Sequence, residues 1–354
     1  MRSLLRWLGI VVVTVAITIA ALGLLGYWFG RELLRTPVAA SWEGEAGEVH
    51  FDLAPQTPFP KILAQLVRAK LISREQAVAL RLYVRFSKRD AALIKAGEYL
   101  LRPSQSPFEI LGVLSQGSVV LHRVTIVEGK NVFEIAQAVE EAGIASAREI
   151  LAAALSSELA SASGLRAESF EGYLFPETYY LPRGMSAHRI LEVFVARFRD
   201  VWSRENLDAL AKKAGGLTQH EVVTMASIIE KEAGVADERT LISAVIHNRL
   251  KRKMKLEMDP TVIYGIYLAR GFFNGNLTRP DLRAPFPHST YAHAGLPPGP
   301  IASPGLASLQ AALSPRSSRA LFFVARGDGS HEFCETLVCH NAAVGTYQLA
   351  RVSP

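Results

Sequence analysis

Two glutamates in the stretch Ala226-Ser-Ile-Ile-Glu-Lys-Glu-Ala-Gly234 have the side chains and the setting for acid catalysis. A carboxyl that borders the apolar face of a helix can be kept protonated, and it can then donate its proton to the oxygen of a breaking bond. The residues that follow are rich in glycine, proline and hydrogen-bonding side chains, which is typical of loops. The pattern indicates a catalytic acid in a groove that binds a saccharide.

The glutamates are expected on an amphipathic helix. Thr218 and Glu221 form a capping-box pattern that predicts the helix start, and Gly234 predicts its end. At 3.6 residues per turn Glu230 flanks the apolar face, so its carboxyl is expected to be partly desolvated, as a general acid requires. Glu232 lies on the opposite flank, so periodicity favours Glu230 only weakly. Either glutamate alone could also be a surface residue paired with lysine or arginine.

The remaining candidate residues would bind the substrate through hydrogen bonds or charge. Arg249 could orient a carboxylate or form a buried salt bridge. Asp259, followed by Pro260, could equally be a plain helix cap. The predicted substrate-binding residues are Asn248, Arg249, Glu257, Asp259, Thr261, Ser289, Thr290, Tyr291, His331 and Asn341.

Further motifs occur along most of the chain. They are Lys95-Ala-Gly-Glu-Tyr-Leu100, Thr125-Ile-Val-Glu-Gly129, Glu171-Gly-Tyr-Leu-Phe-Pro-Glu-Thr-Tyr179, His247-Asn-Arg-Leu250, Asp259-Pro-Thr-Val262, Ser289-Thr-Tyr291, Gly295-Leu-Pro-Pro-Gly-Pro-Ile301 and Gly329-Ser-His-Glu-Phe333. In order and spacing, the chain resembles the YceG-like (MltG-type) endolytic murein transglycosylases. These are inner-membrane enzymes that cut nascent peptidoglycan glycan strands.

The resemblance implies a mechanism and a catalytic residue. Glu230, the first glutamate of Glu-Lys-Glu, would protonate the bond between N-acetylmuramic acid and N-acetylglucosamine and then deprotonate the muramyl C6 hydroxyl, which gives a 1,6-anhydro end. No metal or organic cofactor is implied. A partnership with peptidoglycan synthases, with a role in ending strand growth, is implied. The chain departs from the usual family pattern at Glu257, where glutamine is common, and at Ser289, where asparagine is usual.

Composition and charge bound the possible partners. The chain has 354 residues and a formal net charge of +6, which could suit an anionic partner. The basic residues are scattered except for Lys251-Arg-Lys253 with Lys255, and there is no nucleic-acid motif, so nucleic acid is not expected as a partner. No His-Glu-x-x-His and no second Cys/His pair at zinc spacing occur, so no metal site is expected.

An uncharged apolar run from Trp7 to Phe29 predicts one membrane-spanning helix, because a helix of this length just exceeds a hydrocarbon core of about 30 Å. A cleaved signal peptide with a site at Val38-Ala-Ala40 is the alternative, but its apolar region would be only about 7–15 residues long. The bulk of the chain is expected on the periplasmic side of the inner membrane. Cys334 and Cys339 could form a disulfide there.

The expected fold class is α+β, with a single N-terminal transmembrane helix, a small LysM-like module and a mixed α/β catalytic domain. We predict a tail and transmembrane helix at 1–30, a linker at 31–47, the LysM-like module at 48–118 and the YceG-like catalytic domain at 119–354. Within the module, strands are expected near 49–51 and 97–101, and helices at 60–69, 74–87 and 107–115. The module could bind glycan or serve as a spacer.

Two rival functions remain open. A hydrolytic muramidase would need a second carboxylate, for which Asp259 and Glu257 are the candidates. A membrane-tethered protein that binds glycan without cutting it would need only the LysM-like module, and Glu230 would then be structural. The reducing end of the product separates the first rival from the transglycosylase, and any turnover excludes the second.

Overall fold

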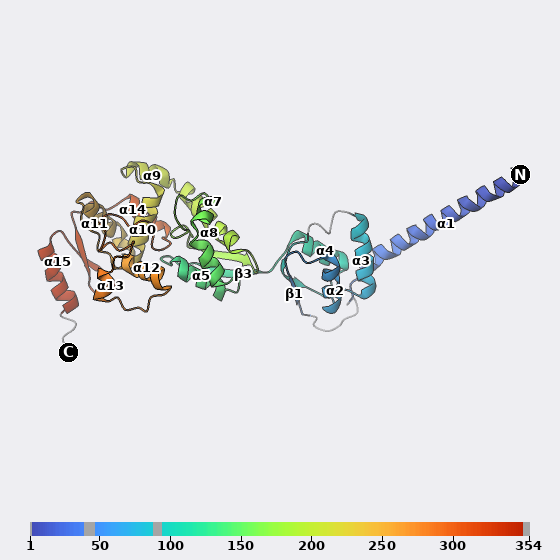
Figure 1. Cartoon of the computed structure of the whole chain (residues 1–354), viewed down its shortest axis with the longest axis horizontal. Coiled ribbons are helices and arrows are strands. Elements are labelled where there is room, and N and C mark those ends of the chain that lie inside the picture. The colour runs from blue at the N-terminus through green and yellow to red at the C-terminus, as the bar shows by residue number, and fades with distance from the viewer. Residues whose placement is uncertain (1, 39–46, 88–93, 350–354) are drawn as a thin grey trace. The chain divides into compact units, whose positions relative to one another are not determined.

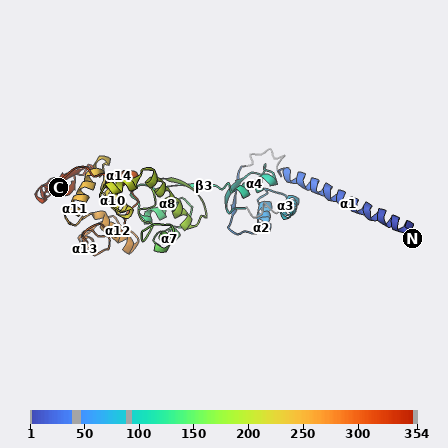
Figure 2. The same ribbon diagram turned by 90° about the horizontal axis from the view of Figure 1, so that it is seen from above.

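The computed structural model describes residues 2–38, 47–87 and 94–349. The chain divides into two compact units, Met1–Leu121 and His122–Pro354 (Figures 1 and 2). Helices and strands both contribute to the fold, as the α+β prediction requires, and within the described residues each sheet has two strands.

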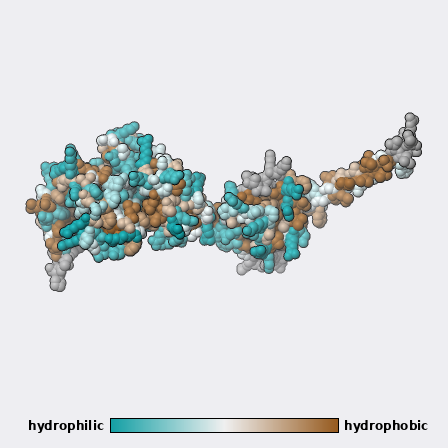
Figure 3. All heavy atoms as spheres, viewed as in Figure 1, coloured by the Kyte–Doolittle hydropathy of each residue, from teal (hydrophilic) through white to brown (hydrophobic). Residues whose placement is uncertain are grey.

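The first unit begins with α1, Arg2–Arg35, a helix whose segment Trp7–Arg35 is long and apolar enough to cross a membrane. Large apolar side chains cover the face of α1 seen in Figure 3. The helix extends beyond residue 30, where a linker was expected, because its last turn belongs to the folded module. Leu34 is 2% exposed in the module core, and the Gln76 side chain donates to the carbonyls of Leu33 and Thr36. Residues 39–46 of the expected linker lie outside the described residues.

The rest of the first unit is a two-stranded antiparallel sheet with three helices. Strands β1 and β2 pair from Val49 opposite Leu101 to Leu53 opposite Gly97. Two helices lie between the strands in the chain and one follows them, close to the predicted ranges. The elements are β1 Val49–Leu53, α2 Phe59–Arg68, α3 Arg74–Ser87, β2 Gly97–Leu101 and α4 Pro107–Gln116.

The second unit is mostly helical. Its strands form the antiparallel pair β5 and β6 and a second sheet of β3 and β4. The strands are β3 Leu121–Thr125, β4 Thr178–Pro182, β5 Phe322–Ala325 and β6 His331–Cys334. The helices are α5 Val132–Glu141, α6 Ala147–Ala154, α7 Ser157–Ala162, α8 Ala187–Arg204, α9 Leu207–Lys213, α10 Gln219–Glu232, η2 Ala236–Glu238, α11 Arg239–Lys251, α12 Asp259–Arg270, α13 Arg279–Arg283, α14 Leu306–Leu313, α15 Leu337–Val344 and the π-helix η3 Gly345–Leu349.

The helix α10 lies at the centre of the second unit. It begins with the predicted capping box of Thr218 and Glu221. Every residue from 222 to 229 is buried, and the helix packs against α9, α11, α12 and α14. The prediction of an amphipathic helix was therefore wrong, because a helix that is surrounded by others on all sides has no solvent face to distinguish. Its first and last turns reach the surface, where Glu221 and Lys231 are exposed.

A disulfide joins Cys334, at the end of β6, to Cys339 in α15, with their Cα atoms 5.7 Å apart. The pairing closes a short loop in which Thr336 caps α15 by accepting from the Cys339 amide. The disulfide thus fixes the start of α15 against the β5–β6 hairpin.

Candidate active site

The last turn of α10 places Glu230 and Glu232 in different surroundings. Two residues along a helix are separated by about 200° around its axis, so the two side chains leave α10 on opposite sides. Lys231 lies between them and donates from Nζ to the Gly129 carbonyl. Each glutamate must therefore be considered with its own neighbours.

Glu230 is held by protein donors on both carboxylate oxygens. Arg239 Nη2 lies 3.1 Å from Oε1, and the Gly305 amide donates to Oε2 at 2.9 Å. The side chain is only 6% exposed. Arg239 is itself anchored, because its Nε donates to the Ser308 hydroxyl. Glu230 thereby ties the end of α10 to α11 and to the start of α14.

Glu128, from the Thr125–Gly129 motif, lies against the same cluster. A Cβ at Gly305 would fall 1.9 Å from Glu128 Oε1, so a larger residue there would displace the Glu128 side chain. Burial and the charge of Glu230 raise the pKa of Glu128, although Arg239 opposes the rise. The backbones of Gly129 and Lys130 pair with Ser303 on either side of this contact. The cluster therefore joins three segments of the chain, and Glu128 itself is exposed.

Glu232 is partly buried and has a strongly perturbed carboxyl. Burial, and secondly the charge of Asp259, raise the pKa of Glu232 to about 8. The carboxyl is therefore mostly protonated at neutral pH. A carboxyl kept protonated by its surroundings, next to a second carboxyl, is the arrangement by which proteins provide a general acid at neutral pH.

Asp259 is oriented by Tyr291. The tyrosine hydroxyl donates to Asp259 Oδ1 at 2.6 Å. Burial, and then this hydrogen bond and charge, raise the pKa of Tyr291, so the hydroxyl remains a donor. The interpretation of Asp259 as a plain helix cap was wrong, because Met258 occupies the cap position and Asp259 is the first residue of α12. Its carboxylate is thus available to the site.

Glu257 and Arg249 form an ion pair in the segment that precedes Asp259. Glu257 lies in the left-handed region with φ of 52°, and its carboxylate pairs with Arg249 Nη1 at 3.1 Å. Arg249 is buried and also donates to the carbonyls of Lys255, Leu256 and Leu321. Arg249 therefore holds the loop before α12 in place, in agreement with the prediction that it forms a buried salt bridge.

Asn248 has a similar structural position. Its side-chain amide donates to the carbonyls of Ser318 and Ala320, each at 2.9 Å. These bonds hold α11 against the segment that leads into β5.

Three predicted hydroxyl residues are buried and hydrogen-bonded, the two threonines to each other and Ser289 to a backbone amide. Thr261 and Ser289 are 0% exposed and Thr290 is 1% exposed. The hydroxyls of Thr261 and Thr290 lie 3.0 Å apart, and the Ser289 hydroxyl accepts from the Ala292 amide. They fasten the loop that carries Tyr291 to the start of α12. Of the motif Ser289-Thr-Tyr291, Tyr291 is the residue that joins the acidic cluster.

The β5–β6 hairpin closes over the residues after α10. A Cβ at Gly234 would lie 2.3 Å from the Gly329 carbonyl oxygen, so the backbones approach as closely as glycine allows. His331 is held by Glu238. The His331 amide donates to Glu238 Oε1, and the His331 Nδ1 is hydrogen-bonded to Glu238 Oε2. Asn341 is exposed on α15, and no hydrogen bond joins it to either glutamate within the described residues.

The loop from Gly295 to Ile301 packs on the side of α10. The Ile301 amide donates to the Ser227 hydroxyl, and His220 Nε2 contacts the Pro298 carbonyl at 2.8 Å. A cavity of about 170 Å³ lies next to this loop and is lined in part by Glu171, Tyr264 and His288. Burial raises the pKa of Glu171 to about 7.

A second cavity, of about 450 Å³, opens beside Tyr291. Arg279, Leu282, Arg283 and Ala292 complete its lining. Its size falls in the range of about 300–1,000 Å³ that is usual for ligand pockets. Tyr291, whose hydroxyl binds Asp259, therefore borders a space that can receive part of a substrate.

Sequence reasoning gave no role to Arg239, Gly305 or Glu128. Arg239 follows Glu230 by nine residues across a break between two helices, so helical spacing does not relate them. Gly305 and Glu128 approach Glu230 from segments far away in the chain. The Thr125–Gly129 motif was the one available signal for this contact.

The sequence is similar to those of a known protein family and of characterised relatives. Residues 51–346 match the YceG-like family. An endolytic murein transglycosylase of Bacillus subtilis strain 168 is 30% identical over 338 residues, which are 91% of this chain and 89% of that protein. An endolytic murein transglycosylase of Streptococcus pneumoniae is 30% identical over 266 residues, which are 66% of this chain and 46% of that protein.

A solved structure has the same fold. The crystal structure of a protein described as yceG-like from Listeria monocytogenes aligns with a TM-score of 0.57 and 28% sequence identity. The alignment covers 84% of this chain and 99% of the other. The match spans both units and most of the motifs described above, and the chain belongs to the YceG-like family.

Proposed function

We propose that this protein is a membrane-anchored lytic transglycosylase that cuts peptidoglycan glycan strands internally. The names of its relatives support this reaction class. The observation that carries the proposal is the position of Glu232, where burial and the nearby Asp259 raise the pKa of its carboxyl, while Tyr291 binds Asp259 and borders a cavity. This is the chemistry that glycosidic bond cleavage requires.

In the proposed mechanism one carboxyl transfers protons twice. Protonated Glu232 donates to the glycosidic oxygen between N-acetylmuramic acid and N-acetylglucosamine, and the bond to the muramyl C1 breaks. The resulting carboxylate then takes the proton from the muramyl C6 hydroxyl, whose oxygen bonds to C1. The products are a free 4-hydroxyl on N-acetylglucosamine and a 1,6-anhydro muramyl end, and no water is consumed.

The surroundings favour Glu232 over Glu230 as the acid. Both oxygens of Glu230 already accept bonds from Arg239 and Gly305, and the side chain is 6% exposed. We therefore assign Glu230 a positioning role, in which it fixes the end of α10 and the turn around Gly305. Glu230 as the acid, which the sequence favoured, remains the competing assignment.

Asp259 and Tyr291 are proposed to keep Glu232 protonated and to contact the sugar beside it. Glu257, Arg249, Asn248, Thr261, Ser289 and Thr290 are proposed to act through the shape of this loop region. His331 and Asn341 remain predicted substrate ligands on the C-terminal segment, and the Asn341 side chain is free to reach a glycan because it is exposed.

The test compares two matched variants on uncrosslinked glycan strands. Glu232→Gln should lower the rate by about two orders of magnitude or more, because glutamine keeps the shape but cannot donate the proton. Glu230→Gln should retain more activity and instead lower the melting temperature, since it weakens the Arg239 ion pair. The reverse order of activities would return the role of acid to Glu230.

Product analysis separates the transglycosylase from its hydrolytic rival. The closeness of Asp259 to Glu232 specifically favours that rival, because hydrolysis needs a second carboxylate. We expect anhydro ends about 18 Da lighter than hydrolytic products, by one water. Reducing ends, together with an inactive Asp259→Asn variant, would establish a muramidase instead.

We also propose that α1 is a permanent membrane anchor and not a cleaved signal. Cleavage after Val38-Ala-Ala40 would remove Leu34 from the module core and leave the Gln76 side chain without the two carbonyls it binds. The second unit is then proposed to lie on the periplasmic side, near peptidoglycan synthases. The protein should stay in membranes after carbonate washing, whereas a soluble form starting near Ser41 would contradict the anchor.

A further inference from the structure

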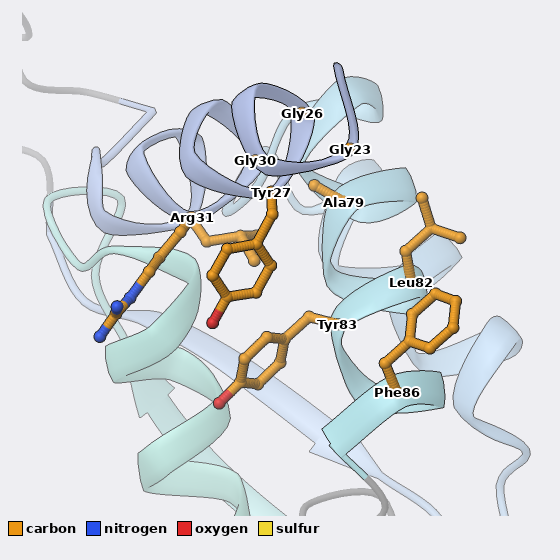
Figure 4. Close-up of a pocket in the computed structure, with 10 residues that line it drawn as sticks. Gly23, Gly26, Tyr27, Gly30, Arg31, Ala79, Leu82, Tyr83 and Phe86 are labelled. Carbon is orange, nitrogen blue, oxygen red and sulfur yellow. The ribbon is translucent and has the colours of Figure 1, made fainter. Parts of the chain in front are cut away.

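A cavity of about 480 Å³ lies where α1 meets α3 (Figure 4). Gly23, Gly26 and Gly30 line it from α1, and Leu82, Tyr83 and Phe86 line it from α3. The rings of Tyr27 and Tyr83 lie close to one another in Figure 4, while Leu82 and Phe86 extend on the side of Gly23. The cavity is mainly apolar, which distinguishes it from the acidic site of the second unit.

The position of α3 along α1 is set by direct bonds. The Gln76 side chain, in the first turns of α3, donates to the carbonyls of Leu33 and Thr36 at 3.2 and 2.7 Å. Leu34 is buried between them in the module core. The depth of α1 in a membrane therefore also determines the depth of α3.

This geometry places the cavity at membrane depth. The uncharged run of α1 ends at Phe29, and a hydrocarbon core of about 30 Å takes up about 20 helical residues. If Phe29 marks the edge of that core, Gly23 lies about 9 Å inside it, at 1.5 Å per residue. The residues of α3 that line the cavity with Gly23 are then level with acyl chains.

The exposed surface of α3 has the composition of a helix at a membrane interface. Val78, Leu82 and Phe86 follow one another at four-residue spacing and are 62%, 52% and 81% exposed. Side chains at this spacing share one face. Such a row of large apolar groups is unusual on a surface in contact with water.

Basic residues border this apolar face. Arg81 and Arg85 are exposed on α3, and at about 100° per residue they lie on one side of the row formed by Val78, Leu82 and Phe86. Arg31 lines the cavity from α1, just beyond the uncharged run. Arginines beside an apolar face match the phosphate groups that lie above acyl chains.

We propose that the apolar face of α3, formed by Val78, Leu82 and Phe86, is embedded in the bilayer leaflet on the module side, where a phospholipid acyl chain fills the cavity against α1. Arg81 and Arg85 bind the lipid phosphates. The inference rests on the proposed membrane span of α1 but on no part of the catalytic proposal. The module is thus docked on the membrane surface and does not swing freely on a tether.

The test uses the full-length protein in phospholipid vesicles containing an anionic lipid. Single cysteines at Leu82→Cys or Phe86→Cys carry an environment-sensitive fluorophore, attached without reductant so that the Cys334–Cys339 disulfide stays closed. Lipids with a nitroxide on the acyl chain should quench both labels and their emission should shift to the blue. Ser118→Cys, at an exposed position of the same unit, should be quenched only by aqueous iodide.

A label at Val15→Cys, within the apolar run of α1, reports on the span separately. Acyl-chain quenching at 15 together with iodide quenching at 82 and 86 would overturn the docking of α3 and leave the anchor intact. Failure of quenching at 15 would instead show that α1 does not span. A third outcome is that neither quencher reaches the labels at 82 and 86 until the protein is diluted in lipid. This result would overturn the proposal and assign the cavity to a contact with a second copy of the chain.

Two double variants test the chemistry of the contact. Leu82→Glu with Phe86→Glu should move a label at Val78→Cys from acyl-chain quenching to iodide quenching, with an unchanged melting temperature because both side chains are exposed. Arg81→Gln with Arg85→Gln should weaken the quenching in vesicles with anionic lipid by several-fold more than in neutral vesicles. Equal effects in both lipids would refute the phosphate contacts.

Discussion

The raised pKa of Glu232 should be visible in the pH dependence of activity. Burial and the charge of Asp259 raise that pKa to about 8 from an ordinary value of 4.5. At pH 7 about nine-tenths of the enzyme would then carry the protonated acid, compared with about 0.3% at the ordinary value. The environment thus increases the active fraction about 300-fold at neutral pH.

The expected profile of kcat/KM has a basic limb near pH 8. The rate should be flat from about pH 5 to 7 and fall about tenfold per unit above pH 8, because the ionised carboxylate cannot donate a proton. Asp259→Asn removes the like charge that raises the pKa, so the limb should move to lower pH. The limb should still lie above the ordinary carboxyl range, since burial is the larger cause.

The measurement is the initial rate of release of soluble fragments from glycan strands between pH 4 and 10. Glu257→Gln is the matched control, because this neighbouring carboxylate pairs with Arg249 and does not contribute to the raised pKa of Glu232. A basic limb that stays in place in Asp259→Asn, or that moves equally in Glu257→Gln, would refute the assignment of Glu232 as the acid.

Three further perturbations test the surroundings of the site. Gly234→Ala should lower stability by about 1–3 kcal/mol and reduce activity, because the new Cβ meets the Gly329 carbonyl at 2.3 Å; thermal unfolding and strand cleavage measure the two effects. Replacing Cys334 and Cys339 by serine should lower the free energy of unfolding by about 2 kcal/mol, the value for a loop this short, and leave the rate nearly unchanged. Burial raises the pKa of Glu171 to about 7, so its stabilising contribution is complete below about pH 4.5 and is lost as the pH rises through 7. Denaturation measured across this pH range should show that the free energy of unfolding falls by about 3 kcal/mol, and Glu171→Gln should make this fall smaller.

Local patterns predicted the helices and strands of the first unit well. The limits of α3 and β2 agree with the structure, and the capping box at Thr218 and Glu221 starts α10 as predicted. These features depend on neighbouring residues, so the chain sequence contains the information directly. The α+β class and the apolar N-terminal helix follow from composition and pattern in the same way.

The candidate site was less predictable because burial depends on distant segments. Ser289 and Thr290 have side chains suited to sugars, but the fold buries them against α12. Glu230 and Glu232 cannot be separated by periodicity, because α10 is buried on all sides and both lie in its last turn. Their difference arises from Arg239, Gly305 and Asp259, which no local pattern connects to them.

The contact between Glu238 and His331 has a consequence for folding order. It joins positions 93 residues apart, and it holds the β5–β6 hairpin over the end of α10. Since loop-closure entropy must be overcome before such contacts form, this closure should come late in folding. With the proposed periplasmic location, a chain that is still being exported would have a central helix but no finished site until its last segment arrives, and the proposed cleavage of glycan should begin only after translocation is nearly complete.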